Sequence, residues 1–359
     1  MPTLSEMMAT LARLTDTSPS LNAERCVNQR HQQAGQCAAC ADACPLQAIT
    51  LTPIPDLDTT VCLACGACCA ACPTDALVGM RSLSELWHRA RATISSSGDA
   101  TLACMAAGSA EYAAARIPCV CALPLEFWFA LAVAGAAQVT IHSGDCGVCP
   151  VKGALEQAAQ AVDDAQALLA KIGGQLAVEL TQAPPPPAPV KAPTAGMSRR
   201  SLFRSLLNPE VTPAPARADG VDALITDGIT PRRALLFDAL DALNVDEAIT
   251  VTPDNGHWAA VSADQRCVGC KMCAQFCPTE ALAVTDNPDS TVTLWFDQAR
   301  CTACGLCLRA CFKHALTYAP TLALRALAHS EYRPIWHGKP AVNALKSPQT
   351  FKVRPGTAR

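Results

Sequence analysis

The spacing of its cysteines constrains this chain more than any other feature of the sequence. The chain has 22 cysteines among 359 residues, and they fall into three blocks rather than along the whole chain. Three runs share one pattern, in which successive cysteines are separated by two, two and three residues; the runs begin at Cys62, Cys267 and Cys301. The fold must therefore bring several sets of four thiols to defined points in space.

This spacing is typical of the ligands of [4Fe–4S] clusters. A cubane presents its irons at tetrahedral corners, and gaps of two residues allow a tightly turning backbone to reach three corners in succession. The fourth cysteine binds the neighbouring cluster, and we expect it to open a helix that runs towards that cluster. Backbone N–H groups in such turns point at the sulfurs and offset their negative charge.

A fourth motif is irregular, because ten residues separate Cys26 from Cys37. The residues between them are mostly polar and predict a loop, while Cys37, Cys40 and Cys44 keep the normal spacing. We interpret Cys26 as a displaced first ligand. Crosswise ligation then predicts four cubes, bound by Cys26, Cys37, Cys40 and Cys72; by Cys44, Cys62, Cys65 and Cys68; by Cys267, Cys270, Cys273 and Cys311; and by Cys277, Cys301, Cys304 and Cys307.

Zinc and disulfides are the alternative uses of so many cysteines. A zinc ribbon needs two separated pairs, whereas three cysteines within seven residues and a fourth close behind offer more thiolates than one zinc ion uses. Disulfide frameworks are typical of small secreted proteins. Cys69, adjacent to the predicted ligand Cys68, is interpreted as a spare buried thiol.

The N-terminus lacks the basic start, apolar core and cleavage site of a signal peptide. The longest apolar run, residues 127–137, is about half as long as a membrane span and is bounded by Glu126 and Gln138, so it predicts a buried helix. We therefore expect a soluble, cytoplasmic protein without a transmembrane segment, whose thiols bind metal.

The residues after each fourth cysteine extend the pattern. The segments PLQAITL, PTDALVGM, PTEALAV and FKHALTY each predict a helical turn that leads into a strand. Together with the cysteine runs they resemble two-cluster [4Fe–4S] ferredoxins, over roughly residues 24–80 and 260–320. Phe312 stands where proline is usual, and since proline is not a ligand we expect altered packing there rather than a lost cluster.

Residues 100–180 predict a different fold, because strands and helices alternate there. The predicted strands are 101–105, 117–124, 139–145 and 175–180, and the predicted helices are 109–116, 125–138 and 146–174. This rhythm indicates a small α/β domain with a parallel sheet. Five cysteines fall at or just beyond the carboxyl ends of its strands, the edge where such sheets bind ligands: Cys104, Cys119, Cys121, Cys146 and Cys149.

The segments IPCV and HSGDC in this region resemble segments of the iron–sulfur delta subunit that links methanogen-type hydrogenase to heterodisulfide reductase. That family has a [2Fe–2S] centre. The chain departs from that family at Ile141, where a cysteine is usual, and at Gly147, where a histidine is usual. The candidate ligands of one additional [2Fe–2S] or [4Fe–4S] cluster are Cys104, Cys119, Cys146 and Cys149, with Cys121 as a substitute.

Two other interpretations of the central cysteines stay open. Cys146 and Cys149 form a C-G-V-C turn before a predicted helix, which would lower a thiol pKa and suit a redox-active pair. The cysteines could equally be inert and buried. We interpret His142 as a structural hydrogen-bonding residue rather than as a ligand.

The predicted organisation is two α+β ferredoxin-like modules that flank a small α/β parallel-sheet domain. We expect an N-terminal 2[4Fe–4S] ferredoxin-like domain at 1–85, the central domain at 86–181, a Pro/Ala-rich linker at 182–220 and a C-terminal 2[4Fe–4S] domain at 221–359. In the linker, residues 198–203 look like the core of a twin-arginine export signal, but no long apolar segment follows. We interpret residues 198–207 as a docking helix; a partner-binding or membrane-surface element is the alternative.

The functional prediction is single-electron relay through about four [4Fe–4S] clusters rather than substrate chemistry. A net charge of −3 and an aromatic content of 4% argue against a nucleic-acid binder. We expect a non-catalytic, ferredoxin-type accessory subunit that connects a cytoplasmic donor to a larger oxidoreductase, with formate dehydrogenase, hydrogenase and a heterodisulfide-reductase-like complex as candidates. The alternatives are a redox enzyme acting on a thiol or disulfide at the central cysteines, and a redox sensor or cluster-delivery protein.

Overall fold

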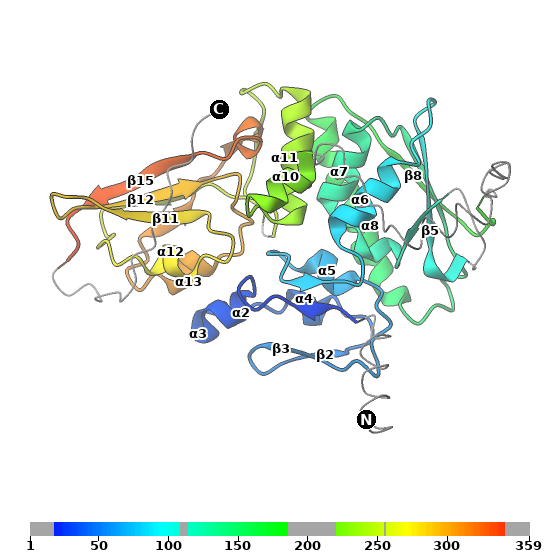
Figure 1. Ribbon diagram of the computed structural model, residues 1–359, viewed down its shortest axis with the longest axis horizontal. Helices are drawn as coiled ribbons and strands as arrows, with labels where there is room; N and C mark the ends of the chain where they lie inside the picture. The colour runs from blue at the N-terminus through cyan, green and yellow to red at the C-terminus, as the bar shows by residue number, and fades with distance from the viewer. Residues whose placement is uncertain (1–17, 108–113, 186–219, 255, 342–359) are drawn as a thin grey trace, which may run out of the picture.

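A computed structural model describes residues 18–107, 114–185, 220–254 and 256–341 of the chain. We refer to residues 18–80 as the N-terminal part, to the described residues of 81–185 as the central part and to those of 220–341 as the C-terminal part. Figure 1 shows the C-terminal part on one side, the central part on the other, and the N-terminal part beneath and between them. The predicted docking helix at 198–207 and most of the predicted linker lie outside the described residues. No helix in the described ranges is long and apolar enough to cross a membrane.

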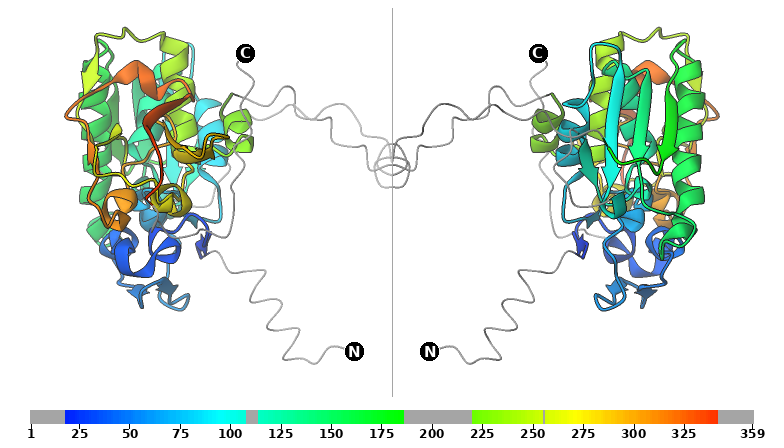
Figure 2. Two further views of the ribbon diagram at one scale, coloured as in Figure 1. Left: turned by 90° about the vertical axis from the view of Figure 1, so that its left-hand side faces the viewer. Right: turned by 90° about the vertical axis from the view of Figure 1, so that its right-hand side faces the viewer.

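The central part contains the predicted parallel sheet, with four strands in the order β6–β5–β7–β8. Its helices lie on the side of the sheet that faces the rest of the molecule (Figures 1 and 2). The strands are β5 (Asp99–Cys104), β6 (Ala115–Ile117), β7 (Gln138–His142) and β8 (Ala177–Thr181), and the helices are α6 (Leu83–Arg91), α7 (Leu125–Val133) and α8 (Leu155–Ala170).

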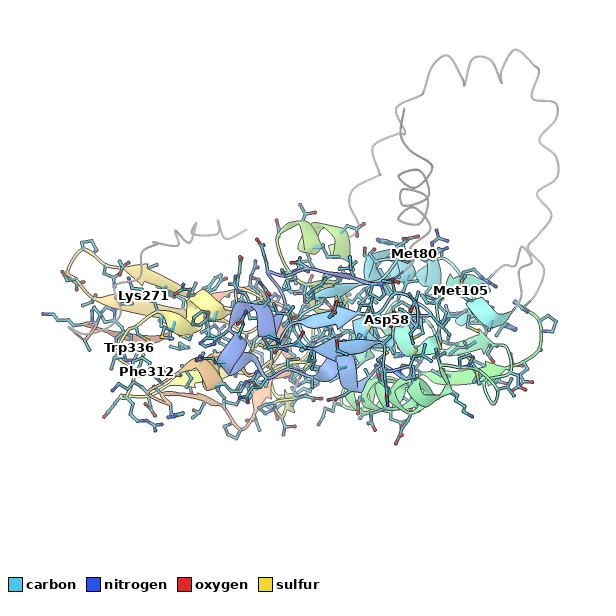
Figure 3. All side chains as sticks on the ribbon, turned by 90° about the horizontal axis from the view of Figure 1, so that it is seen from below. Asp58, Met80, Met105, Lys271, Phe312 and Trp336 are labelled. Atoms are coloured by element: carbon cyan, nitrogen blue, oxygen red, sulfur yellow. The ribbon has the colours of Figure 1, made fainter. Side chains whose placement is uncertain are left out.

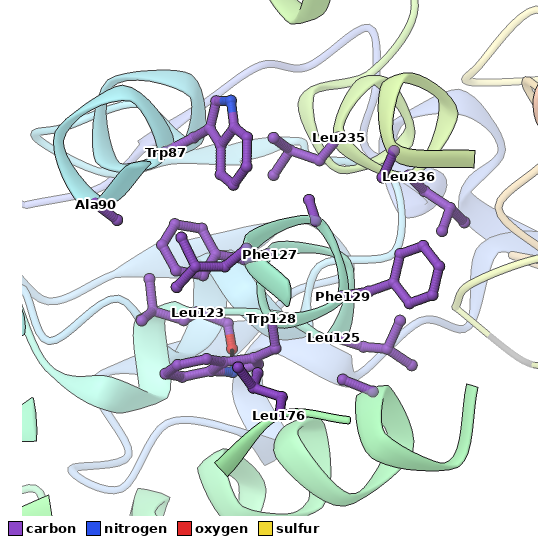
Figure 4. Packing of buried hydrophobic residues seen from close by; sticks show 14 of the residues in the cluster. Trp87, Ala90, Leu123, Leu125, Phe127, Trp128, Phe129, Leu176, Leu235 and Leu236 are labelled. Carbon is purple, nitrogen blue, oxygen red and sulfur yellow. Dashed lines mark hydrogen bonds between the residues drawn. The ribbon is translucent and has the colours of Figure 1, made fainter. Parts of the chain in front are cut away.

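Helix α7 forms the centre of the main hydrophobic core, as its apolar run predicts. Residues 125–131 are all buried, and the ring of Phe127 packs edge-on against Trp87 and Trp128 (Figure 4). Trp128 satisfies its indole N–H by donating to the carbonyl oxygen of Leu123 at 3.2 Å. Because neighbours cover α7 on every side, the helix needs no polar face.

The N-terminal part consists of short elements around two antiparallel strand pairs, β1–β4 and β2–β3. Its strands are β1 (Ser20–Leu21), β2 (Ile49–Leu51), β3 (Pro55–Leu57) and β4 (Leu77–Val78), and its helices are α2 (Val27–Arg30), α3 (Gln32–Gly35), α4 (Ala39–Asp42) and α5 (Ala67–Ala71).

The C-terminal part repeats this plan and extends it. The pair β10–β13 flanks the cysteine runs as β1–β4 does, and a three-stranded antiparallel sheet, β11–β12–β15, covers one side. The elements are α10 (Gly220–Thr226), α11 (Pro231–Leu243), β9 (Thr250–Val251), β10 (Val261–Ala263), α12 (Met272–Phe276), β11 (Leu282–Asp286), β12 (Val292–Asp297), α13 (Leu306–Ala310), β13 (Leu316–Tyr318), β14 (Leu322–Ala323) and β15 (Tyr332–Gly338).

The first turn of α11 joins the three parts. Arg232 and Arg233 are adjacent in sequence and fully buried. The Nε atom of Arg232 donates to Asp75 Oδ1 of the N-terminal part at 3.2 Å, and the Nε atom of Arg233 donates to the carbonyl oxygen of Ala299 in the C-terminal part at 2.7 Å. The same helix packs against α7 of the central part. Two neighbouring side chains thus fix the relative positions of the cysteine-rich regions.

Four local predictions differ from the structure. The segment expected to be a loop between Cys26 and Cys37 contains the short helices α2 and α3. The helix expected at 146–174 begins only at Leu155, because Pro150 and a 3₁₀ turn at 152–154 precede it. The strand expected at 117–124 is β6, which ends at Ile117 and is followed by a 3₁₀ turn at 120–122. Of the helix expected at 109–116, residues 109–113 lie outside the described residues, and β6 begins at Ala115.

Candidate iron–sulfur sites

The three regular cysteine runs fold into the same backbone turn. The residue before each second cysteine and the residue after it both have positive φ angles, which curl the chain around a centre. The first set is Ala64 (51°), Gly269 (65°) and Ala303 (51°), and the second is Gly66 (87°), Lys271 (67°) and Gly305 (73°). The turn aims backbone N–H groups at sulfur: those of Ala64 and Ala303 lie 3.4 and 3.5 Å from the Sγ atoms of Cys62 and Cys301.

A second shared turn follows the fourth cysteine of all four motifs. Its third residue is left-handed in every case: Gln47 (52°), Asp75 (50°), Glu280 (55°) and His314 (48°). The alanine that comes next donates its N–H to the fourth sulfur, at 3.3 Å for Cys44, 3.2 Å for Cys72 and 3.4 Å for Cys311. These alanines are almost fully buried, which explains why the pattern calls for a small side chain there.

The helix that we expected after each fourth cysteine lies before it. Helices α5, α12 and α13 each end at the residue before the fourth cysteine, which caps the helix, and α4 ends two residues before Cys44. The reason is the left-handed residue just described, which directs the chain away from a helix and into a strand.

The folded chain brings the cysteines together in the crosswise sets that their spacing predicts. Three of the sets each line a cavity of their own. We name the sets site I (Cys26, Cys37, Cys40 and Cys72), site II (Cys44, Cys62, Cys65 and Cys68), site III (Cys267, Cys270, Cys273 and Cys311) and site IV (Cys277, Cys301, Cys304 and Cys307).

Asn28, which the sequence analysis did not single out, closes the irregular motif. Its buried amide donates from Nδ2 to the carbonyl oxygens of Cys37 (2.9 Å) and Pro53 (2.8 Å), and its Oδ1 accepts from the N–H of Cys37 at 2.8 Å. These bonds pull the ten-residue insertion together, so that Cys26 reaches the cavity of site I.

The donor sets suit iron–sulfur clusters. Burial and then the neighbouring thiols raise the pKa of Cys40 to about 12, and burial and Cys277 do the same for Cys304. Such thiols resist ionisation until positive metal ions compensate the charge. In the described ranges, no group of three or more His, Cys, Asp or Glu side chains is arranged to hold a single metal ion. A cubane has a different requirement, since its irons stand between the thiolates.

The central cysteines meet at the carboxyl edge of the parallel sheet. Burial raises the pKa of Cys146; the hydroxyl of Ser143 opposes this, and the charges of Cys104, Cys119 and Cys149 add to it. We name these four cysteines, Cys104, Cys119, Cys146 and Cys149, the central site. The Nδ1 atom of His142 lies 2.7 Å from the carbonyl oxygen of Ala183, which is the contact of a structural residue.

Cys121 lies between the central site and site II. Its buried thiol is 3.7 Å from the carbonyl oxygen of Cys65 and also forms hydrogen bonds with the sulfurs of Cys65 and Cys119. These S–H···S contacts lower the pKa of Cys65 to about 6 and that of Cys119 to about 7, against the effect of burial. Cys69 forms a similar bond to Cys68.

The remaining sites also lie next to one another. Cys40 of site I is within the electrostatic reach of Cys68 of site II, and Cys307 of site IV is within that of Cys273 of site III. Arg309 joins sites I and IV. Its Nη2 atom donates to the carbonyl oxygens of Gly35 (2.7 Å) and Cys304 (3.1 Å), and its charge opposes the raised pKa values of both Cys37 and Cys304.

The spatial order of the sites is therefore central, II, I, IV, III, which differs from their order in the chain. A second contact supports the junction between the N- and C-terminal parts. Arg30 donates from Nη2 to the carbonyl oxygens of Gln275 (2.9 Å) and Cys277 (3.2 Å), and the rings of His31 and Phe276 meet edge-on at 4.5 Å.

The fold and the cysteine turns of the C-terminal part define a class of protein domain. Residues 266–315 match the family model of the 4Fe–4S dicluster domain, so this part of the chain is a ferredoxin-type domain with two [4Fe–4S] clusters. The prediction of such a domain here is confirmed. Electron transport is the general role that follows from it.

A curated relative also shows similarity. A region of 63 residues is 35% identical to one subunit of the ion-translocating oxidoreductase complex of Methanosarcina acetivorans. The match covers 18% of this chain and 22% of that protein, so the chain spans only about a fifth of the relative's length. No solved structure matches the chain significantly.

Proposed function

We propose that the chain is a non-catalytic electron-transfer protein with [4Fe–4S] clusters at sites I to IV and a further iron–sulfur cluster at the central site. The observation that carries this proposal is the row of five cysteine sites, in which each site neighbours the next through a thiol or an arginine. The iron content will distinguish a [2Fe–2S] from a [4Fe–4S] cluster at the central site.

Clusters of this kind, when bound, supply one-electron transfer. The chain's own residues provide buried and half-buried thiols and aim N–H groups at the sulfurs. Arginines add positive charge: Arg232 lies within the electrostatic reach of Cys72, and Arg233 within that of Cys301. Positive charge near a thiolate site favours its more negative, reduced state, so these arginines should raise the reduction potentials of sites I and IV.

We further propose an oxidoreductase complex as the partner. The curated relative is a subunit of such a complex, although the match is short. Formate dehydrogenase, hydrogenase and heterodisulfide-reductase-like complexes are the candidate partners, the last two on the resemblance of the central part alone.

A redox enzyme at the central cysteines is the second candidate function. The observation that favours it is the pKa of Cys119, which Cys121 lowers to about 7, because a thiolate at neutral pH is a nucleophile. Alkylation separates the two functions. A bound cluster protects Cys119 in anaerobically purified protein, whereas a catalytic thiol reacts with iodoacetamide and loses that reactivity when a disulfide substrate is added.

The iron and acid-labile sulfide content of anaerobically purified protein tests the main proposal. Four cubes predict about 16 iron atoms per chain, and a central [2Fe–2S] or [4Fe–4S] cluster raises this to about 18 or 20. The extra iron and its EPR signal should disappear in Cys146→Ser, with the other signals retained. Iron near 16 in the wild type would refute a central cluster, and zinc in place of iron would refute the entire proposal.

A further inference from the structure

The turn that follows Cys311 differs from its three counterparts. The shared turn places Pro45, Pro73 and Pro278 after the fourth cysteine, and none of the three is exposed. Pro73 and Pro278 are buried, and Pro45 packs against the backbone at Gly153 of the central part. Phe312 occupies the same position next to a ligand of site III, yet 53% of its surface is exposed.

The residue after Phe312 differs in the same direction. Lys313 is exposed, whereas its counterparts Thr74 and Thr279 are buried and Leu46 is half-buried. The next position does not distinguish the turns, because His314 is exposed like Gln47 and Glu280. The backbone is unchanged, since His314 has the same left-handed φ as its counterparts. A single apolar side chain on a surface needs no explanation. In this turn, however, an exposed phenylalanine and an exposed lysine occupy positions that are buried or half-buried in the other three turns.

Positive charge gathers around this turn. The ammonium group of Lys313 lies 5.3 Å from the centre of the Phe312 ring, and Lys313 and Lys271 both line the cavity of site III. Lys339 lies in the segment that packs against Gly269 in the same cysteine loop. Arg266 is also close, because its charge interacts with Cys311.

Two carboxylates partly balance these cations. Asp264 pairs with Arg266 and Asp286 pairs with Lys271. Two further cations, Lys313 and Lys339, have no ion-pair partner among the described residues, so the surface keeps a positive excess. Figure 3 shows Lys271, Phe312 and Trp336 together at the end of the molecule away from Met80 and Met105. This end carries site III, the last site in the row.

We propose that Phe312, Lys313 and Lys271 form a docking surface for an acidic one-electron carrier protein. In each encounter one electron passes between the carrier and site III, so that one is oxidised and the other reduced, with no bond made or broken. The ring of Phe312 supplies the apolar contact at the centre. Lys313 and Lys339, the cations without an ion-pair partner among the described residues, steer the acidic partner, whereas the charge of Lys271 is largely balanced by Asp286. The inference rests on the proposed function and adds to it the chemistry of the partner and the end of the row at which it binds.

Stopped-flow reduction of the cluster-loaded protein by a dithionite-reduced, acidic plant-type [2Fe–2S] ferredoxin tests this proposal. We expect Lys313→Glu to lower the second-order rate about tenfold at about 0.01 M ionic strength, and the difference to shrink at about 1 M, where charges are screened. Lys171→Glu is the matched control, because it makes the same charge change on an exposed side chain at the end of α8. It should leave the rate within about twofold.

Phe312→Pro provides a second, independent variant. Proline already occupies the three equivalent positions, so we expect the iron content to stay at the wild-type value and the ferredoxin rate to fall. Reduction by dithionite alone, which needs no docking surface, should be equal in all variants at about 1 M ionic strength, where charges on this small anion and on the protein are screened. Equal ferredoxin rates in Lys313→Glu, Phe312→Pro and wild type would overturn the docking surface while leaving the electron-transfer function intact. A wild-type protein without reducible clusters would overturn the function as well.

Discussion

Alanine and glycine determine how closely the cysteine turns approach their neighbours. Ala48, Ala76, Ala281 and Ala315 follow the left-handed residue after each fourth cysteine and are at most 3% exposed. Gly66 plays a related role between two parts of the molecule. A Cβ atom at Gly66 would lie 2.5 Å from the Cβ atom of Ala122, closer than real atoms approach. The absence of a side chain there allows site II to lie against the central part.

Replacing Gly66 by alanine should therefore be more costly than an ordinary left-handed substitution. Gly173→Ala is the control, because Gly173 has φ of 72° but no atom within 4 Å of the added Cβ. We expect a loss of about 1 kcal/mol in the free energy of unfolding for Gly173→Ala and about 3 kcal/mol for Gly66→Ala. Anaerobic urea unfolding measures both. Similar losses for the two variants would show that the contact with Ala122 relaxes freely.

Asn28→Ala tests how the irregular motif reaches site I. The substitution removes three hydrogen bonds at a buried position and releases the loop that carries Cys26. We expect the iron content to fall by about four atoms per chain, with the EPR signals of the other sites retained. Gln160→Ala removes an exposed hydrogen bond on α8 and should leave the iron content unchanged. Full iron in Asn28→Ala would mean that Cys26 is held by other contacts.

At the scale of elements, a buried ion pair connects α7 to the C-terminal part. His257 Nδ1 lies 2.8 Å from Glu126 Oε1, and Glu126 is fully buried. Burial raises the pKa of Glu126, but His257 and Arg232 outweigh burial and lower it to about 2. Burial also lowers the pKa of His257, but the charge of Glu126 outweighs it and holds this pKa above its usual value.

These shifts predict how stability depends on pH. The raised pKa of His257 contributes stability that is complete below the unfolded value of about 6.5 and is lost as pH rises through the folded value. The depressed pKa of Glu126 contributes stability that is present above about 4.3 and is lost only towards pH 2. The pair should stabilise the protein most between about pH 4.5 and 6.5.

Glu126→Gln should lower stability overall, because it leaves Arg232 with less compensation in the core. The diagnostic result is how the urea midpoint changes with pH. In the wild type the midpoint should decline between about pH 6.5 and 8.5, and in the variant most of this decline should be absent. Asp99→Asn, a change at an exposed carboxylate, controls for general charge effects. An unchanged slope in Glu126→Gln would assign the pH dependence to other groups.

The sequence predicts the elements more fully than it predicts their junctions. The parallel sheet, the buried α7 and the crosswise cysteine sets follow from local periodicity and spacing, which are properties of short segments. Helix α8 begins only at Leu155 because the loop that carries Cys146 and Cys149 precedes it. The spacing of the cysteines does not reveal the course of that loop. Asn28 and the arginines of α11 bind partners in other segments of the chain, and a polar or charged side chain in a helix carries no local sign of such a partner.

At the scale of the whole molecule, one side chain spans the junction of sites I and IV. Arg309 donates to the carbonyl oxygens of Ala34 and Gly35 in the N-terminal part and to that of Cys304 in its own part. We expect Arg309→Gln to weaken the magnetic coupling between reduced sites I and IV in EPR spectra, with the iron content unchanged. Arg333→Gln, which breaks an exposed pair with Glu331, is the control. Unaltered coupling in Arg309→Gln would show that Arg30 and α11 suffice to hold the junction.

The row of sites does not follow the direction of synthesis. Residues 18–80 leave the ribosome before the central and C-terminal parts, but sites I and II, which they contain, lie in the middle of the row. Each flank then attaches by its own contacts: the central part through Cys121 and through Gln157, which donates to the carbonyl oxygen of Ala67, and the C-terminal part through Arg309. A chain that ends between residues 185 and 220 would thus keep a shorter row of sites with site I as its new terminus, but it would also lose α11 and expose the apolar surface of α7 that α11 covers.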